Sequence, residues 1–255
     1  MIRFALLGSG SEGNALVVQV GSTTLLMDCG FSVSETVTRL ARLGLQAEQL
    51  DGILVTHEHS DHIAGVARLA RKFDIPVWMT HGTLRFQHAA FAGTTVTEIN
   101  PHSSFSVGDV EVRPILVPHD AGEPVQFVFG DGAFRVGVLT DTGHATPHIE
   151  SILSGCHALI LECNHDEEML RNGRYPASLK QRVGGRFGHL SNAQAAALLS
   201  HLNNENLQHI VAAHLSQQNN LPALAVAALS GALGSSEDWI AVADQQQGLD
   251  WREVG

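Results

Sequence analysis

A run of metal-binding side chains between a strand and a helix constrains this chain more than any other feature. His57, His59, Asp61 and His62 fall between an apolar stretch and an amphipathic pattern. In an extended backbone, residues two apart point to the same side, so the first three can converge, and the turn into the helix re-aims His62. Imidazole and carboxylate together suit a pair of divalent ions. The alternative is a surface loop in which Asp61 only caps the following helix.

One loop cannot complete two metal sites, so further ligands should lie at the ends of other strands, where a rigid sheet fixes them and a loop exposes them. His119, Asp141 and His214 each follow an apolar, strand-like run. We therefore predict that these three residues join the first four in one metal centre.

The rest of the chain alternates between two apolar patterns. Strand-like runs span 2–7, 15–20, 23–27, 52–55, 110–117, 126–129, 134–139 and 210–213, and helix-like patterns span 63–73, 193–202 and 223–233. No linker or repeat divides the sequence, so we expect residues 1–255 to form a single domain of mixed sheets covered by helices.

Charge and targeting signals limit the function further. The net charge of −11, from 15 Lys and Arg against 26 Asp and Glu, argues against a broad basic face for nucleic acid. Bound metal would then supply the positive charge for a phosphate, and we expect the acidic residues to avoid that pocket. No apolar run is long enough for a membrane helix, no secretory signal is recognisable and the three cysteines form no CxxC pair, so we expect a cytoplasmic protein without a membrane partner.

The segment 8–13 spells GxGxxG after a predicted strand, as dinucleotide-binding loops do. That fingerprint needs a helix at its last glycine, yet the next residues, 15–20, read as another strand. We therefore interpret the segment as a hairpin loop. Its glycines allow close approach to a ligand, and we expect Ser9 and Asn14 to line the substrate pocket.

The motif THEHSDH at 56–62 resembles the HxHxDH signature of the metallo-β-lactamase superfamily, and His119, Asp141 and His214 match the order of its later ligands. Five further segments resemble the YycJ (WalJ) branch of that superfamily: GSEGN at 10–14, PHDA at 118–121, LECNHD at 161–166, GHLSN at 188–192 and AHLSQQNN at 213–220. The resemblance extends from residue 1 to about residue 221.

This resemblance implies an α/β fold, a four-layer αββα sandwich of two mixed sheets with a dinuclear centre at one edge. One ion would be held by His57, His59, His119 and bridging Asp141, and the second by Asp61, His62, His214 and the same Asp141. Asp28 is expected to support the ligands from behind. The ligand set leaves Zn, Mn and Fe open as the native ions.

The branch is associated with 5′ to 3′ exonuclease activity on DNA, so phosphodiester hydrolysis is the reaction that the resemblance implies. Two divalent ions about 3.5–4 Å apart can activate a water and clamp the attacking and leaving oxygens. Asp61, as a metal ligand, and His189, as the general acid or a phosphate contact, are the predicted catalytic residues. Glu162 is expected to orient His189, and Asn164 and His165 to contact the substrate.

Several alternatives stay open. An RNA-processing nuclease, a cyclic phosphodiesterase or a glyoxalase-type thioesterase could use the same ligands, and a metal-binding protein without activity would differ only by a blocked site. The branch that hydrolyses β-lactam drugs typically has cysteine where this chain has Asp141, and the diiron redox branch has glutamate in place of His59. The oligomeric state is not predicted.

Overall fold

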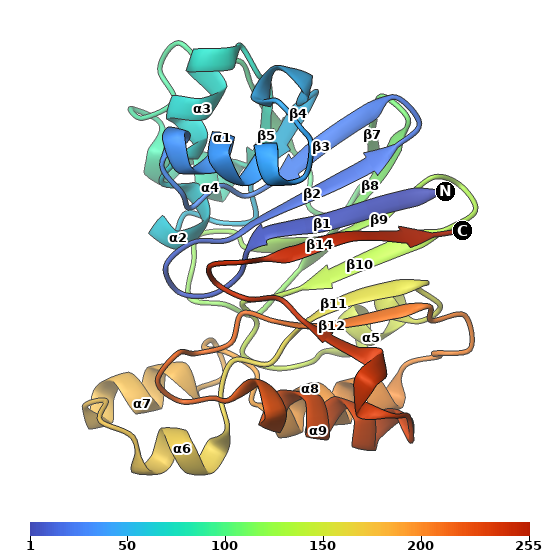
Figure 1. Cartoon of the computed structure of the whole chain (residues 1–255). Coiled ribbons are helices and arrows are strands. Elements are labelled where there is room, and N and C mark those ends of the chain that lie inside the picture. Colours follow the sequence, from blue (N-terminus) through green and yellow to red (C-terminus); the bar gives the residue numbers. More distant parts are fainter.

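Two seven-stranded sheets stack face to face in the computed structural model, which describes all residues from 1 to 255 (Figure 1). The first sheet has the order β14 (Leu249–Val254), β1 (Ile2–Gly8), β2 (Ala15–Val20), β3 (Thr23–Met27), β4 (Gly52–Leu54), β5 (Val77–Thr80), β6 (Val96–Ile99). The second has the order β13 (Ile240–Val242), β12 (His209–Ala213), β11 (Ala158–Glu162), β10 (Arg135–Leu139), β9 (Val125–Gly130), β8 (Val110–Leu116), β7 (Phe105–Val107).

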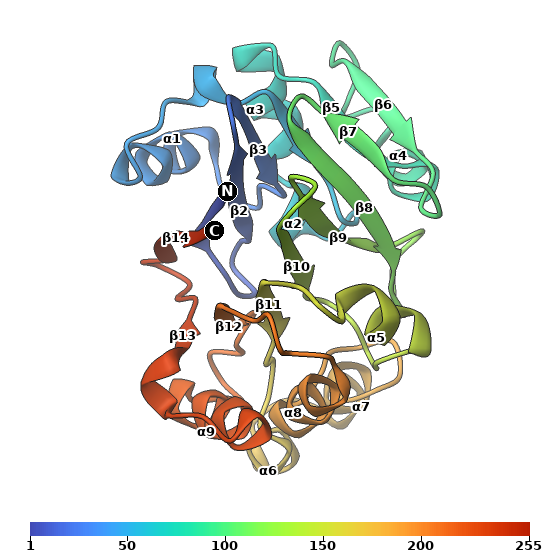
Figure 2. The same cartoon turned by 90° about the vertical axis from the view of Figure 1, so that its right-hand side faces the viewer.

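Helices cover the outer face of each sheet (Figure 2). The first sheet is accompanied by α1 (Val33–Arg42), α2 (Ser60–Ile63), α3 (Val66–Phe73) and α4 (His81–Gln87). The second is accompanied by α5 (Pro147–Leu153), α6 (Glu167–Asn172), α7 (Ala177–Val183), α8 (Asn192–His201) and α9 (Pro222–Leu233). Two short 3-10 helices, Ala47–Gln49 and Glu237–Trp239, complete the elements. None of the helices combines the length and apolarity that crossing a membrane requires.

The apolar side chains form three buried layers. One cluster of 24 buried residues, including Phe4, Phe127 and Phe129, lies between the sheets, and two clusters of 21 lie between a sheet and its helices. Strands covered on both faces read as continuous apolar runs rather than as alternating ones, which explains the sequence pattern of β1 to β3. The predicted four-layer αββα sandwich is confirmed.

The helix predicted over 63–73 is divided in two at Gly65. A Cβ at this position would lie 1.9 Å from the carbonyl oxygen of Phe31, so the chain passes too close for any side chain. The first part, α2, begins after His59, which occupies the N-cap without a side-chain hydrogen bond. Asp61 lies inside the helix and is not its cap.

The glycine-rich segment is a hairpin loop, because β1 pairs antiparallel with β2 directly after it. Most of the predicted ligands follow parallel strands: β3 runs parallel to β4, and β10, β11 and β12 run parallel to one another. Their carboxyl ends meet at one edge of the sandwich. Asp28, Asp141 and His214, each just beyond such an end, have φ values of 60°, 50° and 55°. Residues other than glycine rarely adopt this left-handed backbone conformation. It costs about 1–3 kcal/mol and persists only where the surrounding structure imposes it.

Candidate metal centre

The seven predicted metal ligands converge at this edge of the sandwich. They come from the loop after β4, from the first turn of α2 and from the residues that follow β8, β10 and β12. Five of them are buried: His57, His62, His119, Asp141 and His214. The other two, His59 and Asp61, are partly exposed. The sheet edges thus bring together residues that lie as far apart in sequence as positions 57 and 214.

The ligand atoms form overlapping groups, each with its members within 4.8 Å of one another. In the first group, Nδ1 of His59 lies 3.1 Å from Nε2 of His57 and 3.2 Å from Nε2 of His119.

In the second group, Oδ2 of Asp61 lies 3.4 Å from Nε2 of His62 and 3.5 Å from Nε2 of His214. These two groups correspond to the two ion positions that the resemblance implies, apart from the carboxylate between them.

Asp141 lies between the two groups. Its Oδ2 is 3.2 Å from Nε2 of His62, and its Oδ1 is 3.6 Å from Nε2 of His214 and 4.0 Å from Nε2 of His119. Oδ2 of Asp141 and Nε2 of His214 are both buried without a hydrogen-bond partner. Buried polar atoms of this kind call for a missing partner, and nitrogen and carboxylate oxygen are the donors that a divalent metal ion binds. The residues therefore fit a metal ion.

Charge and burial divide the histidines into two kinds. Burial holds the pKa of His57 well below its usual value and lowers that of His119, so both rings are neutral and ready to bind a cation. Burial alone would also lower the pKa of His214, but the charge of Asp141, the neighbouring carboxylate of Asp61 and the hydrogen bond with Glu162 raise it to about 10. Because metal ligands must lose their protons, binding of a cation to His214 would compete with binding of a proton.

Buried partners fix the ligand rings from behind. His62 donates through Nδ1 to Oδ2 of Asp28 at 2.8 Å, and Asp28 also accepts hydrogen bonds from the backbone N–H and the hydroxyl of Thr56 at 2.8 Å each. His119 donates through Nδ1 to the carbonyl of Gly188 at 3.0 Å. Such contacts set the tautomer and leave Nε2 free to bind a metal ion. Asp28 therefore contacts a predicted ligand from behind, and its role in supporting a bound metal stays a prediction.

Glu162 is the second buried carboxylate behind the centre. Its Oε1 lies 2.8 Å from Nδ1 of His189 and 3.2 Å from Nδ1 of His214. Its Oε2 accepts hydrogen bonds from the backbone N–H groups of Thr142 at 3.1 Å and of Leu190 at 3.0 Å. Burial alone would raise the pKa of Glu162, but the charge and hydrogen bond of His189 lower it to about 2. One ionised carboxylate therefore contacts both His189 and His214.

Replacing Glu162 with Gln is expected to weaken metal binding about 10- to 100-fold, the range observed when the supporting partner of a metal ligand is lost. The amide loses the charge that holds His214 and His189, and one of its two terminal atoms can no longer accept a hydrogen bond. Competition with a chromogenic chelator measures the affinity. The matched control is Glu168→Gln, which changes an exposed side chain on α6. Equal affinity of Glu162→Gln and wild type would contradict the supporting role.

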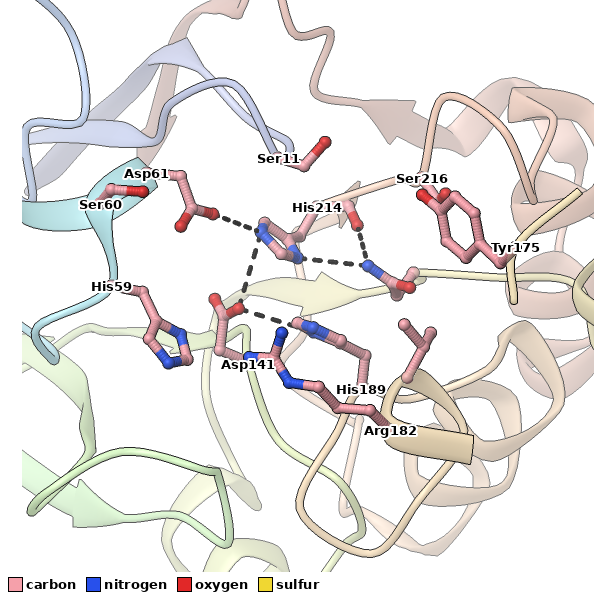
Figure 3. A pocket seen from close by; sticks show the side chains of 12 residues that line it. Ser11, His59, Ser60, Asp61, Asp141, Tyr175, Arg182, His189, His214 and Ser216 are labelled. Carbon is pink, nitrogen blue, oxygen red and sulfur yellow. Dashed lines mark hydrogen bonds and ion pairs between the residues drawn. The ribbon is translucent and has the colours of Figure 1, made fainter. Parts of the chain in front are cut away.

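A pocket of about 300 Å³ opens over the ligands (Figure 3). Its lining residues are Ser11, His59, Ser60, Asp61, Asp141, Asn164, Tyr175, Arg182, Val183, His189, His214 and Ser216. The only acidic residues among them are two of the predicted metal ligands, and an arginine lies opposite. Apart from these two predicted ligands, no carboxylate lines the pocket. We refer to it as the metal pocket.

Of the predicted substrate contacts, Asn164 lines the metal pocket, whereas the other three lie outside its lining. The hydroxyl of Ser9 accepts a hydrogen bond from the backbone N–H of His214 at 2.9 Å. Asn14 donates to Oδ2 of Asp61 at 3.3 Å, and Nδ1 of His165 lies 3.3 Å from Oδ1 of Asn164. Each of these three side chains thus contacts a residue of the metal pocket instead of opening into it.

Sequence reasoning missed several residues of the pocket wall. Ser11 takes the place in the glycine-rich loop that we expected Ser9 to fill, and Tyr175 and Arg182 come from the segment around α7. That segment has no apolar periodicity, so no helix was predicted there. The signal available in the sequence was its charge, because basic residues gather between positions 171 and 186.

Comparisons with known proteins agree with this geometry. Residues 23–214 match the family model described as a beta-lactamase superfamily domain. Exodeoxyribonuclease YycJ of Bacillus anthracis is 38% identical, over 91% of this chain and 89% of its own length. Exodeoxyribonuclease WalJ of Streptococcus pneumoniae is 34% identical, over 88% and 85%. The crystal structure of the metallo-beta-lactamase fold protein YhfI from Bacillus subtilis superimposes with a TM-score of 0.78, 16% identity and 99% coverage of both chains.

Proposed function

Because this chain belongs to the beta-lactamase superfamily, and within it to the family of the exodeoxyribonucleases YycJ and WalJ, we propose that it is a metal-dependent nuclease that hydrolyses DNA phosphodiesters from the 5′ end with two divalent ions. The observation that carries the proposal is the position of Asp141. Its carboxylate lies within 4.0 Å of ligand nitrogens from both groups of metal-binding side chains. Zn, Mn and Fe all suit the donor set.

In the proposed reaction, two groups of side chains would each hold one metal ion. His57, His59 and His119 would hold one ion, Asp61, His62 and His214 the other, and Asp141 both. When bound, two such ions supply an activated water and neutralise the charge that develops on the phosphate. The protein residues fix the positions of the ions and exclude bulk water from the buried side.

His189 is the residue that we propose as proton donor to the leaving oxygen. Its Nδ1 contacts Glu162 at 2.8 Å, which leaves Nε2 for a substrate, and its side chain lines the pocket with 19% of its surface exposed. A positioned imidazolium beside the leaving group contributes roughly 10²- to 10⁴-fold to a rate. Glu162 acts through His189 by orienting the ring.

The decisive experiment loads the metal-free protein separately with Mn, Zn and Fe(II). Each form is assayed on end-labelled single- and double-stranded DNA, on RNA, on a chromogenic phosphodiester and on a glutathione thioester. Hydrolysis of DNA with release of nucleotides from the 5′ end is expected, and Asp61→Ala and His62→Ala should abolish it. The control is Asp238→Ala, which removes an exposed carboxylate near the C-terminal end of α9.

Full activity in Asp61→Ala and His62→Ala would show the two-ion mechanism to be wrong. Hydrolysis of the thioester alone would assign a thioesterase instead, and cleavage restricted to RNA would assign an RNA-processing nuclease. We place the reaction in the cytoplasm, because all three cysteines are buried free thiols, as is usual in reducing compartments.

Metal removal is expected to abolish activity while leaving the fold intact. The three apolar clusters contain none of the seven predicted ligands, so the core forms without the centre. After dialysis against a chelator, far-UV circular dichroism should be unchanged and thermal unfolding should remain cooperative. Addition of metal should restore hydrolysis. Loss of secondary structure on chelation would show that the metal is instead part of the folding energy, as in small zinc domains.

A further inference from the structure

The basic residues of this acidic chain are concentrated in one short segment. Residues 171–186 contain five of the 15 Lys and Arg and no Asp or Glu; the five are Arg171, Arg174, Lys180, Arg182 and Arg186. The rest of the chain therefore holds ten basic residues against all 26 acidic ones. We call this segment, residues 171–186, the basic arm.

The basic arm lies directly beside the metal pocket. It runs from the end of α6 through α7 to the turn before His189, and in Figure 1 these two helices lie away from the stacked sheets. Its C-terminal end is tied to the centre, because the backbone N–H of His189 donates to the carbonyl of Val183 at 2.8 Å. Figure 3 shows Tyr175 and Arg182 of the arm on the wall of the pocket. A ligand in the pocket that is longer than the pocket would thus meet the arm.

The charges of the arm are mostly free. Arg182 is the only member paired with a carboxylate, Asp120, at 2.6 Å, and 57% of its side-chain surface is exposed. Arg171, Arg174 and Arg186 are exposed and have no carboxylate within 4.0 Å. α7 has no buried residue at all. The three unpaired arginines, Arg171, Arg174 and Arg186, lie outside α7, and their exposed charges are available to a polyanion.

An aromatic side chain accompanies these charges. Tyr175, the only tyrosine of the chain, is half-buried between α6 and α7 and lines the metal pocket. Arginines along a groove combined with an aromatic ring are the means by which proteins hold single-stranded nucleic acid, with bases stacked on the ring. Bases inside a duplex are stacked on both faces, so a ring in the pocket wall can stack only on a base at an end or in a single strand.

Building on the proposed nuclease function, we propose that the basic arm binds the phosphate backbone of a single DNA strand whose reacting phosphodiester lies in the metal pocket, and that Tyr175 stacks on an unpaired base of that strand. The arm thereby supplies the local positive charge that the overall composition lacks. It also makes single-stranded DNA the form of substrate that enters the pocket.

Salt-dependent binding tests the arm. The probe is a short, fluorescent, phosphorothioate-linked oligothymidylate, which keeps the backbone charge and resists hydrolysis, and binding to the full-length protein as purified is followed by anisotropy. Arg171→Gln/Arg174→Gln removes two exposed charges that do not line the metal pocket. Each phosphate contact contributes about 0.7 to the slope of log K against log salt for single strands, so this variant should lower the slope by about 1.4 and the affinity about tenfold.

The matched control is Arg113→Gln/Arg252→Gln, which removes the same charge from exposed positions on β8 and β14. It should leave the slope close to the wild-type value. Equal slopes for wild type and the arm variant, or equal losses in the arm and control variants, would overturn the role of the arm.

A second comparison tests the stacking. Tyr175→Leu should weaken binding of the oligothymidylate by about tenfold, within the range of base–aromatic stacking, whereas Tyr175→Phe should bind like the wild type. On an abasic oligonucleotide of the same charge, Tyr175→Leu and wild type should bind equally, because no base is present. Equal loss on both probes would show that Tyr175 has a structural role only.

The proposal for the basic arm and the proposal of nuclease activity can be disproved independently of each other. Binding is measured without hydrolysis, and hydrolysis of the chromogenic phosphodiester by the metal-loaded wild type is measured without the arm's ligand. Unchanged binding in the arm variants with active wild-type enzyme overturns the arm alone. A wild type that hydrolyses no phosphodiester overturns the nuclease, and with it the basis of the arm.

Discussion

Asp141→Asn is expected to lower the rate of DNA hydrolysis about 10³-fold or more. The substitution keeps the size of the side chain but removes the charge that faces both groups of metal ligands, with contacts of 3.2 Å to His62 and 3.6 Å to His214. Metal ions contribute several kcal/mol to such a reaction, and each 1.36 kcal/mol corresponds to about tenfold in rate. Single-turnover rates at saturating metal, together with metal content by mass spectrometry, measure the effect.

The control for this variant is Asp238→Asn, the same chemical change at an exposed site. We expect Asp141→Asn to lose at least one bound ion as well as activity, since a neutral amide oxygen is a poorer bridge. Wild-type rates in a preparation of Asp141→Asn that retains two ions would refute the bridging position assigned to this residue.

His189→Asn is expected to reduce DNA hydrolysis about 10²- to 10⁴-fold, the range of general acid catalysis. The loss should be much smaller on a nitrophenyl phosphodiester, because a nitrophenolate departs without a proton. The comparison of the two substrates is the measurement. It separates proton donation from binding, since a residue that merely contacts the phosphate would affect both substrates alike.

Equal losses on the two substrates would therefore show that His189 binds the phosphate and donates no proton. His148→Asn is the matched control, because His148 is exposed and makes no side-chain contact with the centre. Its rates should equal those of the wild type.

The mixed sheets covered by helices and the convergence of the seven predicted ligands could be predicted because each leaves a local mark in the sequence, whereas the four-layer arrangement was implied by the resemblance. The apolar runs of β1 to β3 and of β8 to β10 are visible as strands, and each predicted ligand follows such a run or stands in the 57–62 cluster. The division of α2 from α3 could not be predicted in this way. It depends on the carbonyl of Phe31 meeting Gly65, a contact between distant parts of the chain.

The residues that line the metal pocket were harder to predict from the sequence, because contacts between distant parts of the chain set their positions. α6 and α7 are short, and α7 buries no residue, so its sequence has no apolar periodicity that would predict a helix. The place of Tyr175 and Arg182 is set by the turns at either end of α7 and by the close approach of Gly188, where a Cβ would lie 2.2 Å from the carbonyl of Arg182. The loop directs the side chain of Ser11 into the metal pocket and that of Ser9 toward the backbone of His214, and the sequence does not reveal this difference.

The left-handed backbone at Asp28, Asp141 and His214 has a consequence for the choice of ion. The apolar layers on which the strands pack hold these three residues in this unfavourable conformation. The sheets therefore fix the positions of the donor atoms, and the centre has little freedom to change its geometry for a particular ion. We therefore expect one divalent ion to replace another with almost no rearrangement of the protein, so that the supply of ions in the cell would decide between Zn, Mn and Fe.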